Sequence, residues 1–327
     1  MKKSTHIYSL FIFALLLTAC FRNAPSDNKK ENRETSASAI QTSDFSSNNF
    51  NITTLEDLYQ FLTYNENRYP LVSAHRGGDS DGLPENAIET FQHWAKQFPL
   101  IIECDVRMSK DSVLILMHDE RLDRTSNGSG RIGKYTLAEL KELLLKDKNG
   151  ELTVYQIPTL EEALTWGKGN VVFTLDVKQD VPYSLLSEII QKTNAQASVV
   201  VITYNANQAR ALNRINPDLM ISASVKSQKD LDKLTEAGIP DNRIVAFVGT
   251  SQPKKDLVEK LHAHGIKTIL GTIGNLDKQA DNKGYQVYAE YIENGADILS
   301  TDRPGEAQKA LDFYIQKRNI KSPFINR

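Results

Sequence analysis

The chain has 327 residues, enough for one large domain or two small ones with a sizeable apolar core. Its 39 Lys and Arg residues nearly balance its 41 Asp and Glu residues, for a net charge of −2. Because the two signs are interspersed and no basic run follows the first residues, the composition argues against a nucleic-acid-binding protein.

The first 20 residues resemble a bacterial lipoprotein signal peptide. Lys2 and Lys3 precede an apolar run, residues 7–17, that is too short to span a bilayer comfortably. The last four residues, LTAC, are similar to a lipobox, in which Cys20 receives a lipid and becomes the mature N-terminus. An uncleaved anchor or a chance cysteine is the alternative. The pattern predicts an exported protein, lipid-anchored to a membrane of the bacterial cell envelope on its periplasmic or extracellular face.

Residues 21–51 are polar, rich in Ser, Asn and Lys, and almost free of apolar side chains. Such a segment cannot bury enough apolar surface to fold, so it predicts a disordered tether to a folded domain of residues 52–327. If Cys20 is lipidated, the second cysteine, Cys104, has no partner, and no disulfide is expected.

The folded part begins with a predicted helix and continues as a β/α repeat. Thr54, with Asp57 three residues on, is a plausible cap for a helix to about Asn67, which we expect to plug one end of the fold. From Leu71 onward, β-branched runs alternate with amphipathic stretches, the pattern of a (β/α)8 TIM barrel. The predicted strands are LVSAH, IIECDV, VVFTLDV, SVVVITY, LMISASV, RIVAFVG, IKTILGT and ADILST.

One excursion interrupts this repeat after the second strand. Residues 112–118, SVLILMH, predict an extra strand that returns the chain to the same rim of the barrel. Residues 119–158 then form a long rim loop with a short helix near residues 136–145 and a polar hairpin at DKNGEL. Long loops above a barrel rim are commonly functional, and a surface elaboration without a binding role is the alternative.

Two acids of the second strand point to a cation site. Glu103 and Asp105 lie two residues apart in IIECDV, so both side chains face one side of the strand and Cys104 faces the other. Two buried acids repel each other and lose hydration unless a cation or a proton lies between them. We interpret the pair as ligands of a hard metal ion; a solvated strand end is the alternative.

Two of the six histidines follow predicted strands. His75 ends PLVSAH and is followed by Arg76, whereas His118 ends SVLILMH and is followed by Asp119. A lone histidine at a strand end is more often an ordinary hydrogen-bonded residue than a catalyst. Two histidines close to an acidic pair and an arginine indicate a catalytic site.

Seven strings together resemble the glycerophosphodiester phosphodiesterase family in order and spacing, from about Leu71 to about Ala310. This resemblance implies Glu103, Asp105 and Asp176 as metal ligands. An all-carboxylate set favours Ca²⁺ or Mg²⁺ over zinc. The family usually has glutamate at the third position, so Asp176 is a departure. The strings are HRG, PEN, IECDVR, LMHDERLDRT, IPTLEEAL, LDVK and ADILSTDRP.

The resemblance implies metal-dependent hydrolysis of small-molecule glycerophosphodiesters to glycerol 3-phosphate and an alcohol. Arg76, Lys178 and the cation would neutralise the phosphate and bind the substrate. His75 and His118 would transfer protons when the glycerol 2-hydroxyl attacks phosphorus, and again when water opens the cyclic phosphate. Asp302, before a helical pattern, is most simply an N-cap.

Two alternative functions remain at this point. The first is a phospholipase C-like phosphodiesterase that acts on inositol or other membrane phospholipids. The second is a lipid-tethered protein that binds a phosphorylated ligand without turnover. The segment ILGTIGNLD stands where the family often has a Trp-containing motif near the glycerol pocket, which leaves the alcohol undetermined. No protein partner is indicated.

Overall fold

The structure, a computed structural model, describes residues 49–326. The expected signal peptide, the lipidation site Cys20 and residues 21–48 of the expected tether lie outside the described residues. Asn49 and Phe50 form strand β1 (Asn49–Phe50), which pairs antiparallel with β13 (Ile325–Asn326) near the other end of the chain. The described fold thus includes residues 49–51, which precede the expected boundary at residue 52, because a short strand near the C-terminus pairs with this segment.

Eight parallel strands close into a barrel, which confirms the predicted (β/α)8 fold. The closure is direct, because the last strand pairs with the first through Thr301 and Ala74, and the first pairs with the second through Ala74 and Ile102. The barrel strands are β2 (Leu71–Ala74), β3 (Ile101–Met108), β7 (Val172–Val177), β8 (Val199–Thr203), β9 (Met220–Ser224), β10 (Ile244–Gly249), β11 (Thr268–Gly271) and β12 (Ile298–Thr301).

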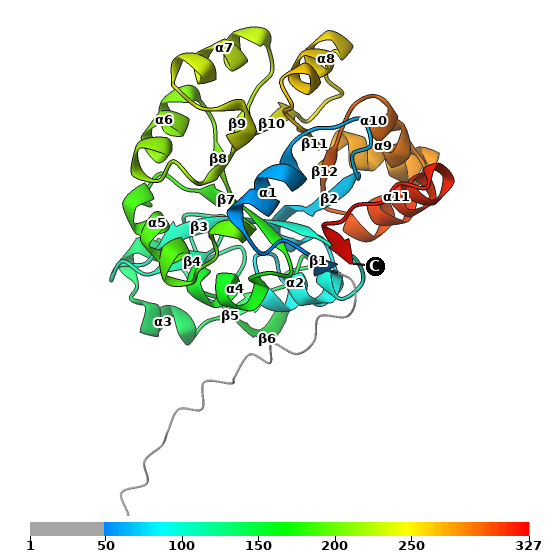
Figure 1. Ribbon diagram of the computed structural model, residues 1–327. Helices are drawn as coiled ribbons and strands as arrows, with labels where there is room; N and C mark the ends of the chain where they lie inside the picture. Colours follow the sequence, from blue (N-terminus) through cyan, green and yellow to red (C-terminus); the bar gives the residue numbers. More distant parts are fainter. Residues whose placement is uncertain (1–48, 327) are drawn as a thin grey trace, which may run out of the picture. The chain divides into compact units, whose positions relative to one another are not determined.

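Helices surround the barrel (Figure 1) and pack apolar side chains against the outer face of the strands. In α6, for example, Ala209 and Leu212 are buried on one face, and Asn205 caps the first turn by accepting hydrogen bonds from two backbone N–H groups. Cys104, on the helix side of β3, is a fully buried free thiol. The outer helices are α2 (Ile88–Ala95), α4 (Leu160–Gly167), α5 (Tyr183–Lys192), α6 (Ala206–Ile215), α7 (Gln228–Glu236), α8 (Lys255–Ala263), α9 (Asn275–Lys283), α10 (Val287–Glu293) and α11 (Pro304–Arg318).

Helix α1 (Leu55–Leu62) closes the end of the barrel where the strands begin, as predicted. Thr54 and Asp57 form the expected capping box. The Lys267 ammonium, just before β11, donates to the Phe61 carbonyl at 2.7 Å. The helix ends five residues earlier than the predicted Asn67, because Thr63 is extended and forms an antiparallel bridge with Ile266.

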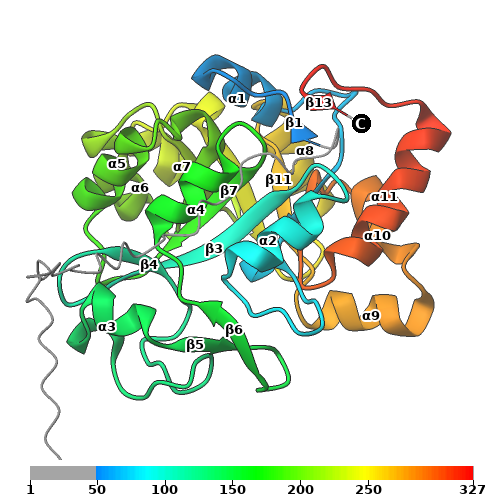
Figure 2. The same ribbon diagram turned by 90° about the horizontal axis from the view of Figure 1, so that it is seen from below.

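The predicted excursion after β3 is present at the opposite end of the barrel. Strand β4 (Leu114–Leu116) pairs antiparallel with β3, and the predicted short helix is α3 (Leu137–Lys141). The predicted hairpin consists of β5 (Leu144–Lys146) and β6 (Leu152–Gln156). Figure 2 shows α1 and this hairpin at opposite ends of the barrel.

The excursion is a packed substructure with an apolar cluster of its own. The apolar cluster consists of Ala87, Ile115, Met117, Leu122, Ile132, Leu140, Leu145 and Ile157.

Short 3-10 turns at η1 (His75–Gly77), η2 (Ile132–Lys134), η3 (Gln196–Ser198) and η4 (Asp241–Arg243) complete the elements of the structure. Among the described residues, no helix is both long enough and apolar enough to cross a bilayer.

Candidate active site

The carboxyl ends of the barrel strands form the rim that carries the residues singled out in the sequence. The histidine and arginine of HRG follow β2, two acids lie on β3, and a third lies on β7. The second histidine follows β4 and is returned to this rim, because the Met117 backbone N–H donates to the Asp105 carbonyl at 3.0 Å. The rim of a parallel barrel is where active sites of this fold are built.

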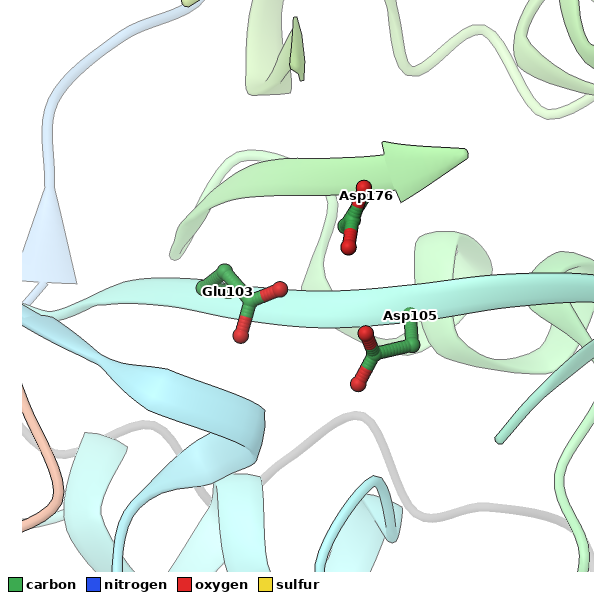
Figure 3. A group of neighbouring side chains, drawn as sticks. All are labelled: Glu103, Asp105 and Asp176. Atoms are coloured by element: carbon green, nitrogen blue, oxygen red, sulfur yellow. The ribbon is translucent and has the colours of Figure 1, made fainter. Parts of the chain in front are cut away.

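Three buried carboxylates converge at this rim (Figure 3), one acid residue from β7 and two from β3. Glu103, Asp105 and Asp176 each offer an oxygen, and these oxygens all lie within 4.8 Å of one another. The strand register explains their proximity, because Asp105 pairs with Asp176 and Glu103 is two residues away on the same face. The structure thus brings together the three acids that the sequence selected.

Of the three carboxylates, Glu103 is the one whose ionised form a bound cation would stabilise most. Burial, followed by repulsion from Asp105, raises the pKa of Glu103 well above its ordinary range. Burial also raises the pKa of Asp105, but the Lys178 ammonium outweighs it and holds that pKa below its ordinary value. Three buried carboxylates with only oxygen donors fit a hard divalent cation such as Ca²⁺ or Mg²⁺.

Lys178 lies between two of these acids. Its Nζ is 2.6 Å from Asp105 Oδ1 and 2.6 Å from Asp176 Oδ2. Burial lowers the pKa of the ammonium, but the two carboxylates outweigh burial and raise it. Lys178 therefore keeps its positive charge at the rim.

His75 faces this cluster from the end of β2. Its Nδ1 is 2.7 Å from Asp302 Oδ1, and its Nε2 is 4.0 Å from Glu103 Oε2. Burial lowers the pKa of His75, but the Asp302 hydrogen bond and the Glu103 charge outweigh it and raise that pKa. The imidazole is thus oriented by one carboxylate with its other nitrogen turned toward the acid cluster.

The prediction that Asp302 serves as an N-cap is wrong. The following helix, α11, begins at Pro304 with Arg303 as its N-cap residue, and no side chain caps it. Asp302 binds His75 instead because closure of the barrel places the end of β12 beside the end of β2. The only sign of this contact in the sequence was the position of Asp302 directly after the last strand.

Arg76 links the acid cluster to the first rim loop. Its backbone N–H donates to Glu103 Oε2 at 2.8 Å, and its guanidinium Nε lies 3.5 Å from Asp105 Oδ2. Its Nη1 also donates to Glu85 Oε1 at 3.2 Å. The chain turns sharply here, and the next residue must be glycine, because a Cβ on Gly77, where φ is +93°, would lie 2.6 Å from the Phe91 ring.

His118 has a carboxylate partner of its own. Its Nδ1 is 2.7 Å from Asp119 Oδ1, and Arg124 holds the other oxygen of that carboxylate at 2.7 Å. The hydrogen bond from Arg124 is the largest cause that lowers the pKa of Asp119 well below its ordinary range. Arg124 also binds Glu85 at 2.7 and 2.8 Å, so it joins the excursion to the first rim loop. The sequence left Arg124 outside the candidate set.

Two further residues support the acids, and sequence reasoning did not assign these contacts. The Tyr204 hydroxyl donates to Asp176 Oδ1 at 2.8 Å; burial, then the Asp176 charge, raise the pKa of Tyr204. The Asn86 amide donates to Asp105 Oδ2 at 2.8 Å and accepts from the Asp105 backbone N–H at 2.9 Å. Asn86 therefore braces Asp105, one of the three acids of the cluster.

Two cavities meet at His75. One, of about 250 Å³, occupies the mouth of the barrel, where Glu103 and Asp176 line it together with apolar side chains such as Phe247. The other, of about 510 Å³, lies between the first rim loop and the β5–β6 hairpin. A reacting group beside His75 would therefore have room on two sides.

Comparison with known proteins gives one consistent family. The model of the Glycerophosphoryl diester phosphodiesterase family matches residues 75–306. A glycerophosphodiester phosphodiesterase of Caldanaerobacter subterraneus subsp. tengcongensis is 34% identical over 158 residues, which are 46% of this chain and 65% of that protein. A glycerophosphodiester phosphodiesterase of Bacillus subtilis (strain 168) is 26% identical over 228 residues, which are 63% of this chain and 77% of that protein.

Solved structures show the same similarity. A glycerophosphoryl diester phosphodiesterase from Parabacteroides distasonis ATCC 8503 is 36% identical with a TM-score of 0.78, covering 81% of this chain and 94% of that chain. An Oleispira antarctica phosphodiesterase, solved in complex with the product sn-glycerol-3-phosphate, is 24% identical with a TM-score of 0.63. The similarity covers 78% of this chain and 99% of that chain. The latter similarity bears on the fold alone.

Proposed function

Because the chain belongs to the glycerophosphoryl diester phosphodiesterase family, a family of phosphoric diester hydrolases, we propose that it hydrolyses glycerophosphodiesters to glycerol 3-phosphate and an alcohol. The observation that carries this proposal is the convergence of His75, three buried carboxylates and two cationic side chains at one rim. Such a set can hold an anionic phosphodiester and exchange protons with it.

The residues that would hold a divalent cation are Glu103, Asp105 and Asp176. Their buried carboxylates fit a hard cation, as their close spacing and the raised pKa of Glu103 indicate. When bound, such a cation supplies a Lewis acid that polarises phosphoryl oxygens and lowers the pKa of a coordinated hydroxyl group.

Arg76 and Lys178 provide the fixed positive charge of the site. Arg76 Nε is a buried donor without a hydrogen-bond partner in the described structure, and it points toward the Asp105 side of the cluster. A phosphate oxygen would satisfy this donor, since a buried unpaired N–H is costly. Both side chains would also stabilise the additional negative charge of the transition state.

The two histidines are arranged alike, and this similarity supports a shared role. Each has its Nδ1 2.7 Å from a carboxylate oxygen, His75 at Asp302 and His118 at Asp119. A carboxylate at Nδ1 fixes the tautomer and leaves Nε2 for the substrate. One imidazole accepts the proton of the attacking glycerol 2-hydroxyl, and the other protonates the departing alcohol. The roles reverse when water opens the cyclic phosphate.

A panel of diesters tests the proposal. The purified protein is incubated with glycerophosphocholine, glycerophosphoethanolamine and phosphatidylinositol, each with Ca²⁺, with Mg²⁺ and with a chelator, and released glycerol 3-phosphate is measured. We expect release from the two glycerophosphodiesters, with one or both cations, and its loss with chelator. Cleavage of phosphatidylinositol alone would instead favour a phospholipase C-like activity, and binding without release from any diester would favour a non-catalytic protein.

Asp302→Asn should lower kcat while preserving the fold. The neutral amide loses a charge-assisted hydrogen bond to His75, worth about 1.5–3 kcal/mol, which corresponds to a decrease of about ten- to a hundredfold. Steady-state kinetics, with circular dichroism as a check on folding, measure this effect. Asp312→Asn on α11 is a control remote from the rim, and a kcat for Asp302→Asn equal to that of this control would remove Asp302 from the orientation of His75.

A further inference from the structure

The larger of the two cavities at His75 has no assigned role so far. Its inner wall includes His75, Arg76 and Asp302, and its outer wall is the turn of the β5–β6 hairpin, residues 146–150. Figure 2 shows that hairpin as a projection from the rim end of the barrel. The long segment after β4 thus forms part of a cavity that opens directly onto the proposed reaction centre.

The two cavities match the two halves of a glycerophosphodiester, one of which is constant and the other variable. The smaller cavity, of about 250 Å³, is built largely from barrel strands and contains Glu103 and Asp176, so it suits the glycerol half, which is the same in every substrate. The other cavity, of about 510 Å³, is built largely from loops and is twice as large. It suits the alcohol half, which varies among substrates.

Most charged groups of the larger cavity are already paired. Glu85 binds Arg76 and Arg124, and Asp302 binds His75. Lys148 also lines the cavity, and it pairs at 3.1 Å with Asp81, which does not line it.

Asp79 differs from these residues. Its carboxylate makes no hydrogen bond or ion pair within residues 49–326, although its backbone N–H is fixed to the Asp302 carbonyl at 2.7 Å. Gly78 keeps the loop against the start of α11, because a Cβ there would lie 2.4 Å from the Pro304 ring. Asp79 is an exposed residue that lines the cavity. Loss of hydration, then the negative charge of Asp302, raise its pKa despite Lys148, Arg303 and His75 nearby. The loop therefore presents to the cavity, next to His75, a carboxylate that has no partner among residues 49–326.

We infer that this cavity receives the alcohol half of the diester, and that Asp79 selects alcohols that carry a positively charged amine. This inference rests on the proposed function. A diester of this kind is zwitterionic: its phosphate lies beside Arg76 and Lys178, and its ammonium group lies beside Asp79. The ammonium would relieve the repulsion between Asp79 and Asp302, whereas a neutral alcohol such as glycerol would not.

Binding measurements test the inference independently of turnover. The full chain carrying His118→Ala is titrated calorimetrically with glycerophosphoethanolamine and with glycerophosphoglycerol, and the ratio of the two Kd values is compared with that of His118→Ala/Asp79→Asn. We expect the first protein to prefer the amine, and Asp79→Asn to reduce the preference by about two- to fivefold, as for an exposed ion pair. Circular dichroism confirms that both proteins are folded.

Asp81→Asn is the matched control. Asp81 lies on the same loop with its side chain 93% exposed, and it carries the same charge outside the cavity. The preference for the amine should be unchanged in this variant. An equal preference with and without Asp79, or no preference in the His118→Ala protein, would overturn the inference. Hydrolysis of the two diesters by the unsubstituted protein, measured separately, reports on the proposed function itself.

Discussion

His118→Ala should lower kcat for glycerophosphodiesters by about 10²–10⁴-fold, the usual contribution of a general acid or base. The imidazole lies at the rim, with its Nδ1 held by Asp119 and its side chain 36% exposed. Its removal eliminates one of the two proton-transfer groups without leaving a cavity in the core. Steady-state kinetics at saturating cation measure the decrease, and thermal unfolding should show a Tm close to that of the parent.

His93→Ala controls for the loss of an imidazole as such. His93 is exposed on α2 and contacts the neighbouring Trp94 ring edge-on, with 4.8 Å between the ring centroids. This variant should retain the parent's kcat. If His118→Ala also retains activity near that of the parent, the assignment of proton transfer to His118 is wrong.

Much of the site was predictable because its determinants are local in the sequence. The alternation of a strand placed Glu103 and Asp105 on one face, and the family resemblance carried by the LDVK string added Asp176 and Lys178. The eight strands were predictable because each is a β-branched run between helical patterns, and parallel strands of that kind close into a barrel with one functional rim.

The unpredicted contacts depend on closure of the barrel or on the reach of a long side chain. Asp302 and His75 are 227 residues apart, and only the pairing of the last strand with the first brings them together. Before a helical pattern, an aspartate is equally consistent with an N-cap, so the local signal favoured the wrong role. Tyr204 reaches Asp176 from the end of the next strand, β8. A tyrosine at a strand end does not specify which neighbouring acid it will contact.

The hairpin of the excursion could be predicted from the sequence, but its position over the rim could not. The turn residues of DKNGEL predicted a hairpin, and β5 and β6 are present on either side of it. The side of the rim that this hairpin covers depends on the apolar cluster beneath it and on Arg124, which ties Asp119 to Glu85. These contacts join segments that are distant in the chain, so the cavity they create has no local signature.

Asp176→Asn should weaken the affinity for the divalent cation by about tenfold or more and reduce hydrolysis accordingly. An amide keeps one oxygen donor but loses the negative charge that a hard cation requires. It also keeps only one acceptor where Asp176 now receives hydrogen bonds from both Lys178 and Tyr204. Calorimetric titration of the chelator-treated protein with Ca²⁺ and with Mg²⁺ measures the affinity, and the cation dependence of kcat should shift in parallel.

Asp180→Asn separates the loss of a ligand from the loss of charge at the rim. Asp180 lies four residues after Asp176, is 42% exposed, and pairs with Arg107 at 3.4 Å, outside the buried cluster. If Asp176 binds the cation, only Asp176→Asn should shift the titration, because a screened surface charge contributes little to a site that buried carboxylates define. Identical titration curves for the parent and Asp176→Asn would instead remove Asp176 from the ligand set and leave Glu103 and Asp105 as a two-carboxylate site. In that case the role of Asp176 would be to hold the Lys178 ammonium, and the loss of activity would appear in the binding of substrate and not in the binding of cation.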